Sequence, residues 1–210
     1  GILAPDNGSI VFDGHELTGL RPDLIARLGL RRTYQNLRLF KMMTVRENIM
    51  IGATHRAKAG LIRTIFDQKT FRVEEKMLAE QADGVIEQLH LQRFANHSVG
   101  SEPYGIQKMT AVGIALIDRP KLLLLDEPAA GLNPSERTMF VDMIQKILEE
   151  GTKILLIEHN MDVVMNISKK ITVLNFGSKI AEGTPEEIRD NDTVIKAYLG
   201  KKFYKPEEAI

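Results

Sequence analysis

The sequence predicts an α/β fold built on a parallel sheet, and three observations support this prediction. Residues 121–126 and 152–159 are apolar runs of strand length, and each reaches charged residues at its end. A helical pattern over 134–150 separates them, with Pro134 at its start and Gly151 just after its end. Two apolar strands joined by one helix form a βαβ unit, so both strands are expected in one parallel sheet, as buried strands.

The other elements are predicted from alternation, turn residues and helical periodicity. Before the βαβ unit they are a strand in a hairpin-like meander over 8–14, a helix over 22–30, a strand over 31–35 and helices over 44–57, 71–91 and 107–117. Thr44 and Glu47 have the spacing of a capping box at the start of helix 44–57. After the unit they are a helix over 161–169, a hairpin over 171–183 turning at Gly177 and Ser178, and helices over 185–190 and 193–199.

The order of these elements predicts a division of the chain. The mostly helical stretch 44–118 lies between the first strands and the βαβ unit, so we expect a separate helical lobe there. The predicted boundaries are therefore 1–43, 44–118, 119–200 and a loose tail over 201–210.

Composition limits the function classes. Lys plus Arg and Asp plus Glu number 28 each, so no overall field attracts nucleic acid, and we expect no nucleic-acid partner. The chain has no cysteine, which excludes disulfides and cysteine metal sites. No apolar run approaches the roughly 18 residues that a membrane-spanning helix needs.

Polar side chains follow three of the predicted strands. Asp126 and Glu127 end the strand 121–126, and ligands of parallel sheets bind at the carboxyl ends of strands. An Asp there can help to hold Mg²⁺ on nucleotide phosphates, and the neighbouring Glu can polarise an attacking water. Glu158 and His159 end the next strand, where a His can contact a γ-phosphate, and Gln35 ends a third. The simpler alternative is that the carboxylates only begin a loop and cap the following helix.

Together these stretches resemble the nucleotide-binding subunit of ABC transporters. The resemblance covers residues 8–200 and rests on "RTYQNLRLF" for the Q-loop, "LLLLDEP" for Walker B, "GLNP" for the D-loop and "ILLIEHNM" for the switch histidine. The ATPase of branched-chain amino acid importers is the more similar branch, through "DEPAAGLNPSE", "LLIEHNMDVVMNIS" and the closing "GTPEEIRDND". A basic insert at 54–75 favours the longer of the two ATPase subunits of such importers.

The resemblance implies a P-loop NTPase-like ABC ATPase core, with a mixed sheet and flanking helices, plus a helical subdomain that carries the signature motif. It implies ATP and Mg²⁺ as cofactors. Asp126 and Gln35 would serve the metal, Glu127 would be the catalytic base, and His159 would sense the γ-phosphate. The residues expected at the nucleotide are Gln35, Tyr104, Gly105, Gln107 and Asn133.

The implied partners are integral-membrane permease subunits and a second ABC ATPase subunit in a head-to-tail dimer. Arg38, Leu39 and Phe40 would lie near the groove where a coupling helix of the permease docks, unless they pack internally, and residues 130–133 would lie at the dimer interface. The implied location is the cytoplasmic face of the inner (plasma) membrane, as a peripheral subunit.

The sequence departs from the family pattern twice. It contains no G-x-x-x-x-G-K-[ST] string, so we expect the Walker A strand and helix to precede Gly1 or to be lost. The signature region reads "SEPYGIQKM", in which Pro103 replaces the expected Ser and Glu102 adds a negative charge. Losing one hydrogen bond to phosphate costs about 1.5–3 kcal/mol, so the signature is expected to be weakened.

Two other functions remain open at this stage. One is an ABC-like interaction module without turnover, favoured by the missing Walker A string and Pro103 but opposed by the intact Asp126, Glu127 and His159. The other is an ABC ATPase for another cargo, such as lipopolysaccharide export, because the ATPase subunit does not touch the cargo.

Overall fold

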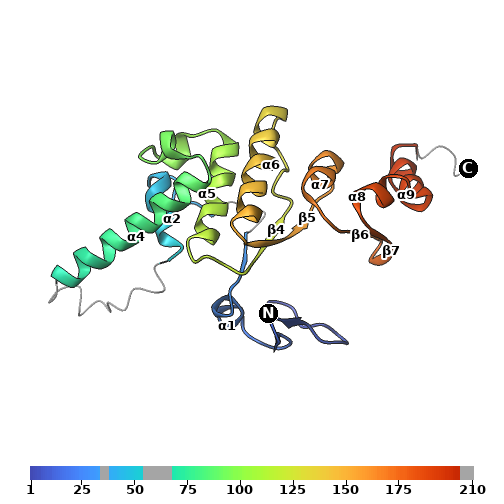
Figure 1. The fold of residues 1–210 in the computed structure, drawn as a ribbon, viewed down its shortest axis with the longest axis horizontal. Coiled ribbons are helices and arrows are strands. Elements are labelled where there is room, and N and C mark those ends of the chain that lie inside the picture. The colour runs from blue at the N-terminus through green and yellow to red at the C-terminus, as the bar shows by residue number, and fades with distance from the viewer. Residues whose placement is uncertain (34–37, 54–67, 204–210) are drawn as a thin grey trace, which may run out of the picture. The chain divides into compact units, whose positions relative to one another are not determined.

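The computed structural model describes residues 1–33, 38–53 and 68–203, and the chain divides into two compact units, Gly1–Ile157 and Glu158–Ile210 (Figure 1). The first unit contains β1 (Val11–Phe12), β2 (His15–Glu16), α1 (Pro22–Arg27), β3 (Leu30–Arg32), α2 (Val45–Ile51), α4 (Gln68–Gln88), two 3₁₀ turns (Gln92–Phe94 and Val99–Ser101), α5 (Tyr104–Leu116), β4 (Leu122–Asp126), α6 (Pro134–Glu149) and β5 (Lys153–Ile157). The second contains α7 (Met161–Ile167), β6 (Ile171–Asn175), β7 (Ser178–Gly183), α8 (Pro185–Arg189) and α9 (Asp192–Phe203).

The sheet that positions the predicted site is parallel and runs in the order β3-β4-β5. Its register pairs Arg32 with Leu124 and Asp126 with Ile157, so the strand ends that were expected to carry polar residues meet at one edge. Helix α6 connects β4 to β5, which confirms the predicted βαβ unit. Asn133 caps α6 and Pro134 begins it, as the sequence pattern indicates.

The prediction that β5 is buried is wrong. Leu155 and Ile157 are 56% and 60% exposed, and Lys153 is exposed as well. The strand alternates because its two faces differ in burial: Lys153, Leu155 and Ile157 share an exposed face, whereas Ile154 and Leu156 are half-buried on the other. It is also shorter than predicted: Glu158 leaves the ladder, and its carboxylate accepts hydrogen bonds from the backbone N–H groups of His159 and Asn160.

Helices α2, α4 and α5 pack together within the first unit. The division that sets residues 44–118 apart as a separate helical lobe stays a prediction. Thr44 caps α2, and the expected capping box with Glu47 is present. The helix ends at Ile51 rather than near residue 57. Its last turn lies against α5, where a Cβ on Gly52 would approach the carbonyl oxygen of Ile114 to 2.1 Å. Helix α5 begins at Tyr104, three residues before the predicted start, with Pro103 as its N-cap residue.

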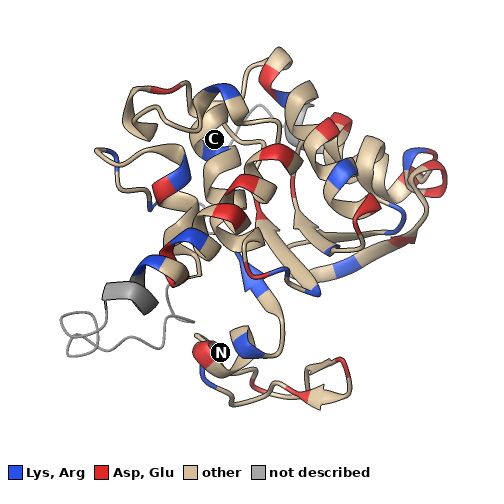
Figure 2. Cartoon of the chain, turned by 60° about the vertical axis from the view of Figure 1, so that its left-hand side comes forward, with Lys and Arg blue, Asp and Glu red and all other residues tan. Residues whose placement is uncertain are grey.

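Helix α4 confirms the helix that was predicted over 71–91. Figure 2 shows both basic and acidic segments on α4; the basic ones lie in its first half, and the charged residues from Glu80 to Glu87 are all acidic. Within the described ranges, no helix is both long enough and apolar enough to cross a bilayer.

The second unit is held by a small apolar core of Ile171, Ile188 and Val194. The predicted hairpin is present as β6 and β7, but its turn falls on Phe176 and Gly177 rather than on Gly177 and Ser178. Both turn residues have positive φ, 46° and 81°, as a type I′ turn requires. Helix α9 extends to Phe203, four residues beyond the predicted end.

Candidate functional site

Asp126 lies at the carboxyl end of the central strand, β4. One oxygen of its carboxylate accepts a hydrogen bond from the guanidinium of Arg32 at 2.7 Å, and the Asp126 side chain is 26% exposed. Arg32 ends the neighbouring strand β3, so the ion pair crosses between two strand ends. Sequence reasoning missed Arg32, although it lies within the strand that was predicted over 31–35; the observed strand is Leu30–Arg32, and Gln35 lies outside the described residues.

Glu127 follows Asp126 in a strained backbone conformation. Its φ is +45°, in the left-handed region that non-glycine residues avoid. Its N–H donates to the carbonyl of Ile157 at 2.9 Å, and its own carbonyl accepts the N–H of Ala130 at 3.2 Å. The half-buried Glu127 is therefore held by its backbone on both sides. Such strain costs of order 1–3 kcal/mol and is typical of functional positions.

The turn between β4 and α6 contains the residues expected at the dimer interface. Gly131 adopts φ +79°, and a Cβ there would meet the ring of Tyr104 at 3.1 Å. The side-chain oxygen of Asn133 accepts the N–H of Glu136 at 2.9 Å, and the Glu136 carboxylate accepts the N–H of Asn133. The oxygen of Asn133 thus serves as a helix cap, and its contact with nucleotide stays a prediction.

The signature residues form the first turn of α5. Tyr104 is 43% exposed, and the N–H of the buried Gly105 donates to the Glu136 carboxylate at 3.1 Å. The side-chain amide of Gln107 donates to the carbonyl of Glu102 at 2.8 Å. Pro103 makes no side-chain cap hydrogen bond, as its lack of a hydroxyl requires.

Lys108 is a buried residue that sequence reasoning missed. It is only 6% exposed, and its ammonium group donates to the carbonyls of Glu127 and Pro128 at 3.2 and 2.8 Å. Lysine is rarely buried in full, and no local pattern marks this one. Helix α5 is therefore fastened directly to the turn that contains Glu127.

His159 belongs to the second unit, Glu158–Ile210. It follows β5 by two residues and directly precedes Asn160, whose side-chain oxygen caps α7 by accepting the N–H of Val163. The Glu158 carboxylate accepts the N–H groups of both His159 and Asn160, at 3.0 and 3.2 Å. His159 thus stands in a hydrogen-bonded turn at the start of a helix.

Gln35 lies outside the described residues, so its expected role stays a prediction. Arg38 and Phe40, which follow it, are exposed, and Leu39 is half-buried. Phe40 is 58% exposed although its backbone is fixed by the side chain of Asn48. The alternative that these residues pack internally therefore does not hold for Phe40 and holds only in part for Leu39, and their contact with a permease stays a prediction.

The described residues fit a nucleotide-bound Mg²⁺ better than a metal held by protein alone. No cluster of three or more His, Cys, Asp or Glu side chains suitable for a metal occurs in the described part of the chain. Mg²⁺ in phosphate-transfer sites keeps several waters and takes only one or two carboxylates besides the phosphates. A lone Asp126 at the end of β4 is consistent with that donor set.

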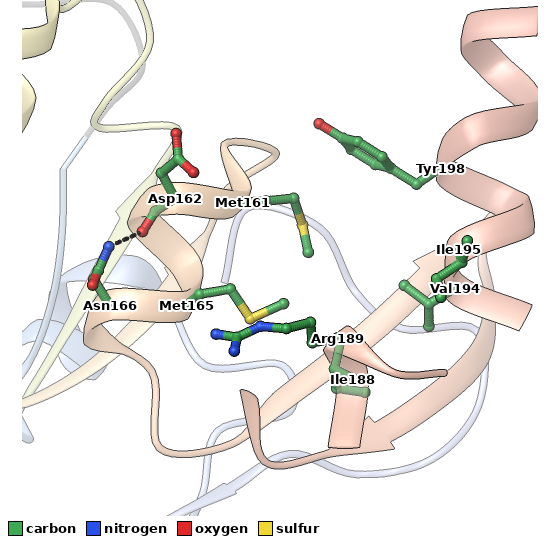
Figure 3. A pocket seen from close by; sticks show the side chains of 9 residues that line it. All are labelled: Met161, Asp162, Met165, Asn166, Ile188, Arg189, Val194, Ile195 and Tyr198. Carbon is green, nitrogen blue, oxygen red and sulfur yellow. Dashed lines mark hydrogen bonds between the residues drawn. The ribbon is translucent and has the colours of Figure 1, made fainter. Parts of the chain in front are cut away.

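A separate groove of about 480 Å³ lies in the second unit, between α7 and the two C-terminal helices (Figure 3). Its lining residues are Met161, Asp162, Met165, Asn166, Ile188, Arg189, Val194, Ile195 and Tyr198. None of the predicted catalytic or nucleotide-contacting residues lines it, so the groove is distinct from the candidate site.

Comparisons with known proteins agree with this geometry. The family described as "ABC transporter" matches residues 1–130, and the one described as "Branched-chain amino acid ATP-binding cassette transporter" matches residues 178–204. The chain is 44% identical over 202 residues to the high-affinity branched-chain amino acid transport ATP-binding protein BraF of Pseudomonas aeruginosa, covering 96% of this chain and 79% of that protein. It is 39% identical to LivG of Escherichia coli K12, with the same coverage.

Solved structures give the same result. The crystal structure of the ADP conformation of MJ1267, an ATP-binding cassette of an ABC transporter, superposes with a TM-score of 0.79 at 28% identity, covering 95% of this chain and 80% of that one. The class of protein is therefore an ABC transporter ATP-binding cassette, which confirms the predicted fold class. The chain belongs to the branched-chain amino acid family of these ATPases, the family of BraF and LivG.

Proposed function

We propose that this chain is the ATP-hydrolysing subunit of an importer of branched-chain amino acids. The observation that supports this most is the end of β4, where Asp126 and the strained Glu127 meet the ends of β3 and β5. The names of BraF and LivG include branched-chain amino acid transport, which supports these amino acids as the cargo. The subunit would pair head to tail with a second ABC ATPase and bind permease subunits at the cytoplasmic face of the membrane.

In this proposal the two carboxylates at the end of β4, Asp126 and Glu127, have different roles. Bound Mg²⁺ supplies neutralisation of charge on the β- and γ-phosphates. Asp126 is the carboxylate ligand, oriented by its ion pair with Arg32, and Gln35 is the second residue at the metal. Glu127 accepts a proton from the attacking water, and general-base catalysis of this kind contributes about 10²- to 10⁴-fold to the rate.

The remaining predicted residues would complete two sites in the dimer. His159 would contact the γ-phosphate in its own subunit, at the amino end of α7. Tyr104, Gly105 and Gln107 would face the nucleotide of the partner subunit, and Asn133 would lie at the interface between subunits. Pro103 would weaken the site that this signature serves, because neither a hydroxyl nor an N–H is available at that position.

The test uses the native full-length protein assembled with its permease in membrane vesicles. Glu127→Gln should lower kcat for ATP by about 10²- to 10⁴-fold while nucleotide binding persists. Glu149→Gln, at the exposed end of α6, is the matched control and should behave as the parent protein. A Glu127→Gln protein that retains more than half of the parent rate would remove Glu127 from the mechanism.

The same vesicles separate the alternatives. Uptake of radiolabelled leucine that depends on ATP supports the importer, and hydrolysis without leucine uptake supports a different cargo. Binding to the permease without any hydrolysis supports the interaction module.

A further inference from the structure

We propose that Lys108 is a positioning residue for Glu127, which ties the signature helix of this subunit to its own hydrolytic site. The proposal rests on the proposed function, since it takes Glu127 as the base. It begins from a contact that no local pattern indicates: a buried ammonium group on α5 bound to the backbone of the turn after β4.

The turn after β4 receives a charged donor from α5. Glu127 has a left-handed backbone conformation, and its carbonyl and that of the buried Pro128 both point to the ammonium group of Lys108. The Glu127 carbonyl also accepts the N–H of Ala130 at 3.2 Å, so Lys108 adds a charged donor to a carbonyl that the backbone of the turn already binds. A charged donor that binds two successive carbonyls fixes both peptide planes, and with them the direction of the Glu127 side chain.

Two further contacts join the same parts of the chain. The N–H of Gly105 donates to the Glu136 carboxylate on α6, and the ring of Tyr104 lies against Gly131. The ring of Tyr104 also stands 5.3 Å from the ammonium of Lys108. The start of α5, from Tyr104 to Lys108, is thus attached at three points to the segment 127–136. Figure 1 shows α5, α6 and β4 as neighbours.

The functional consequence follows from what each part is expected to face. Tyr104 and Gly105 belong to the signature, which would contact the nucleotide of the partner subunit, whereas Glu127 would act on the nucleotide of its own subunit. A movement of α5 is transmitted through Lys108 to the peptide planes of Glu127 and Pro128. Lys108 does not touch the reacting atoms; it acts through the backbone of Glu127.

The test compares Lys108→Met with Thr110→Val in the native full-length protein. Met fills a similar volume without a donor. Thr110 is fully buried in the same helix, and its hydroxyl donates to the carbonyl of Ile106 within α5, so its loss is structural only. Hydrogen exchange is read at the amides of Ala130 and Leu132, which are bonded to carbonyls inside the turn and report its opening.

Lys108→Met should speed exchange at Ala130 and Leu132 by at least about tenfold, while amides of α6 and β4 exchange as in the parent. In the assembled transporter it should lower kcat for ATP and leave KM unchanged. Thr110→Val should not speed exchange at Ala130 and Leu132 more than it speeds exchange in the rest of the chain. Lys108→Gln keeps an uncharged donor, so its exchange rates and its kcat should lie between those of Lys108→Met and those of the parent. It replaces Lys108→Met if that variant does not fold.

Unchanged exchange at the turn, or equal acceleration across the whole unit, would overturn the proposal. So would a loss of kcat in Lys108→Met that Thr110→Val matches. Because the exchange measurement needs no ATPase activity, it is decisive even where Glu127→Gln shows that the proposed catalytic role is wrong.

Discussion

The buried side chain of Asn48 gives the sharpest test of how the segment after the Q-loop is held. Asn48 is fully buried on α2. Its side-chain oxygen accepts the N–H of Phe40 at 2.9 Å, and its amide nitrogen donates to the carbonyls of Phe40 and Thr44 at 3.1 and 2.9 Å. One side chain thereby fixes both ends of the loop 40–44.

Asn48→Ala removes these three hydrogen bonds and a longer one, at 3.4 Å, to the carbonyl of Met43. The Phe40 and Thr44 carbonyls keep backbone donors, from Met43 at 2.9 Å and from Asn48 itself at 3.0 Å, but the N–H of Phe40 loses its partner. At about 1 kcal/mol for each hydrogen bond, with part recovered by those backbone donors, the free energy of unfolding should fall by about 2–3 kcal/mol.

Urea denaturation of the native protein measures this difference. Asn166→Ala is the matched control: the same substitution at an exposed position on α7, whose side chain donates to the carbonyl of Asp162. It should change the free energy of unfolding by less than about 0.5 kcal/mol. If Asn48→Ala lowers the free energy of unfolding no more than the control does, Asn48 does not hold the loop 40–44, and the backbone of Phe40 is fixed by other contacts.

Three further predictions concern the signature, the α6 cap and the second hairpin. Pro103→Ser should restore a donor to phosphate and raise ATP affinity in the assembled dimer by about 10- to 150-fold, measured by nucleotide titration; no change would mean that position 103 does not reach the nucleotide. Asn133→Ala should cost about 1 kcal/mol of unfolding free energy, seen in urea, through loss of the α6 cap; a change below about 0.3 kcal/mol would contradict this. Lys170 and then Lys179 lower the pKa of Glu182 to about 2 from 4.5. A depressed carboxylate pKa adds stability above 4.5 that is lost as the pH falls toward 2, so the second unit should weaken across that window. Glu182→Gln should remove this dependence in pH-resolved melting, and an unaltered profile would count against the ion pairs.

The parts of the fold that were predicted correctly are those whose signals are local. The apolar run of β4, the cap at Asn133, Pro134 and the glycine after α6 all lie within one stretch of chain, so the βαβ unit can be read without tertiary information. The exposure of Leu155 and Ile157 could not be predicted, because a run of apolar residues does not specify whether one or both faces of the strand are covered.

The candidate site divides in the same way. Asp126 and Glu127 were identified because a strand end followed by two carboxylates is visible in the sequence. Arg32 and Lys108 were missed because their partners are 94 and 19 to 20 residues away, and only the packing of β3 and α5 against β4 and its turn brings them together.

The start of the signature helix explains why these long-range contacts matter. A helix usually satisfies its first N–H groups through its own N-cap side chain, but Pro103 offers none. The N–H of Gly105 is satisfied instead by Glu136, which also completes the capping box of α6. One carboxylate thus serves two helix starts, so α5 cannot shift without disturbing the beginning of α6. The signature in this chain is therefore tied to the start of α6 through Glu136, and to the turn that contains Glu127 through Lys108.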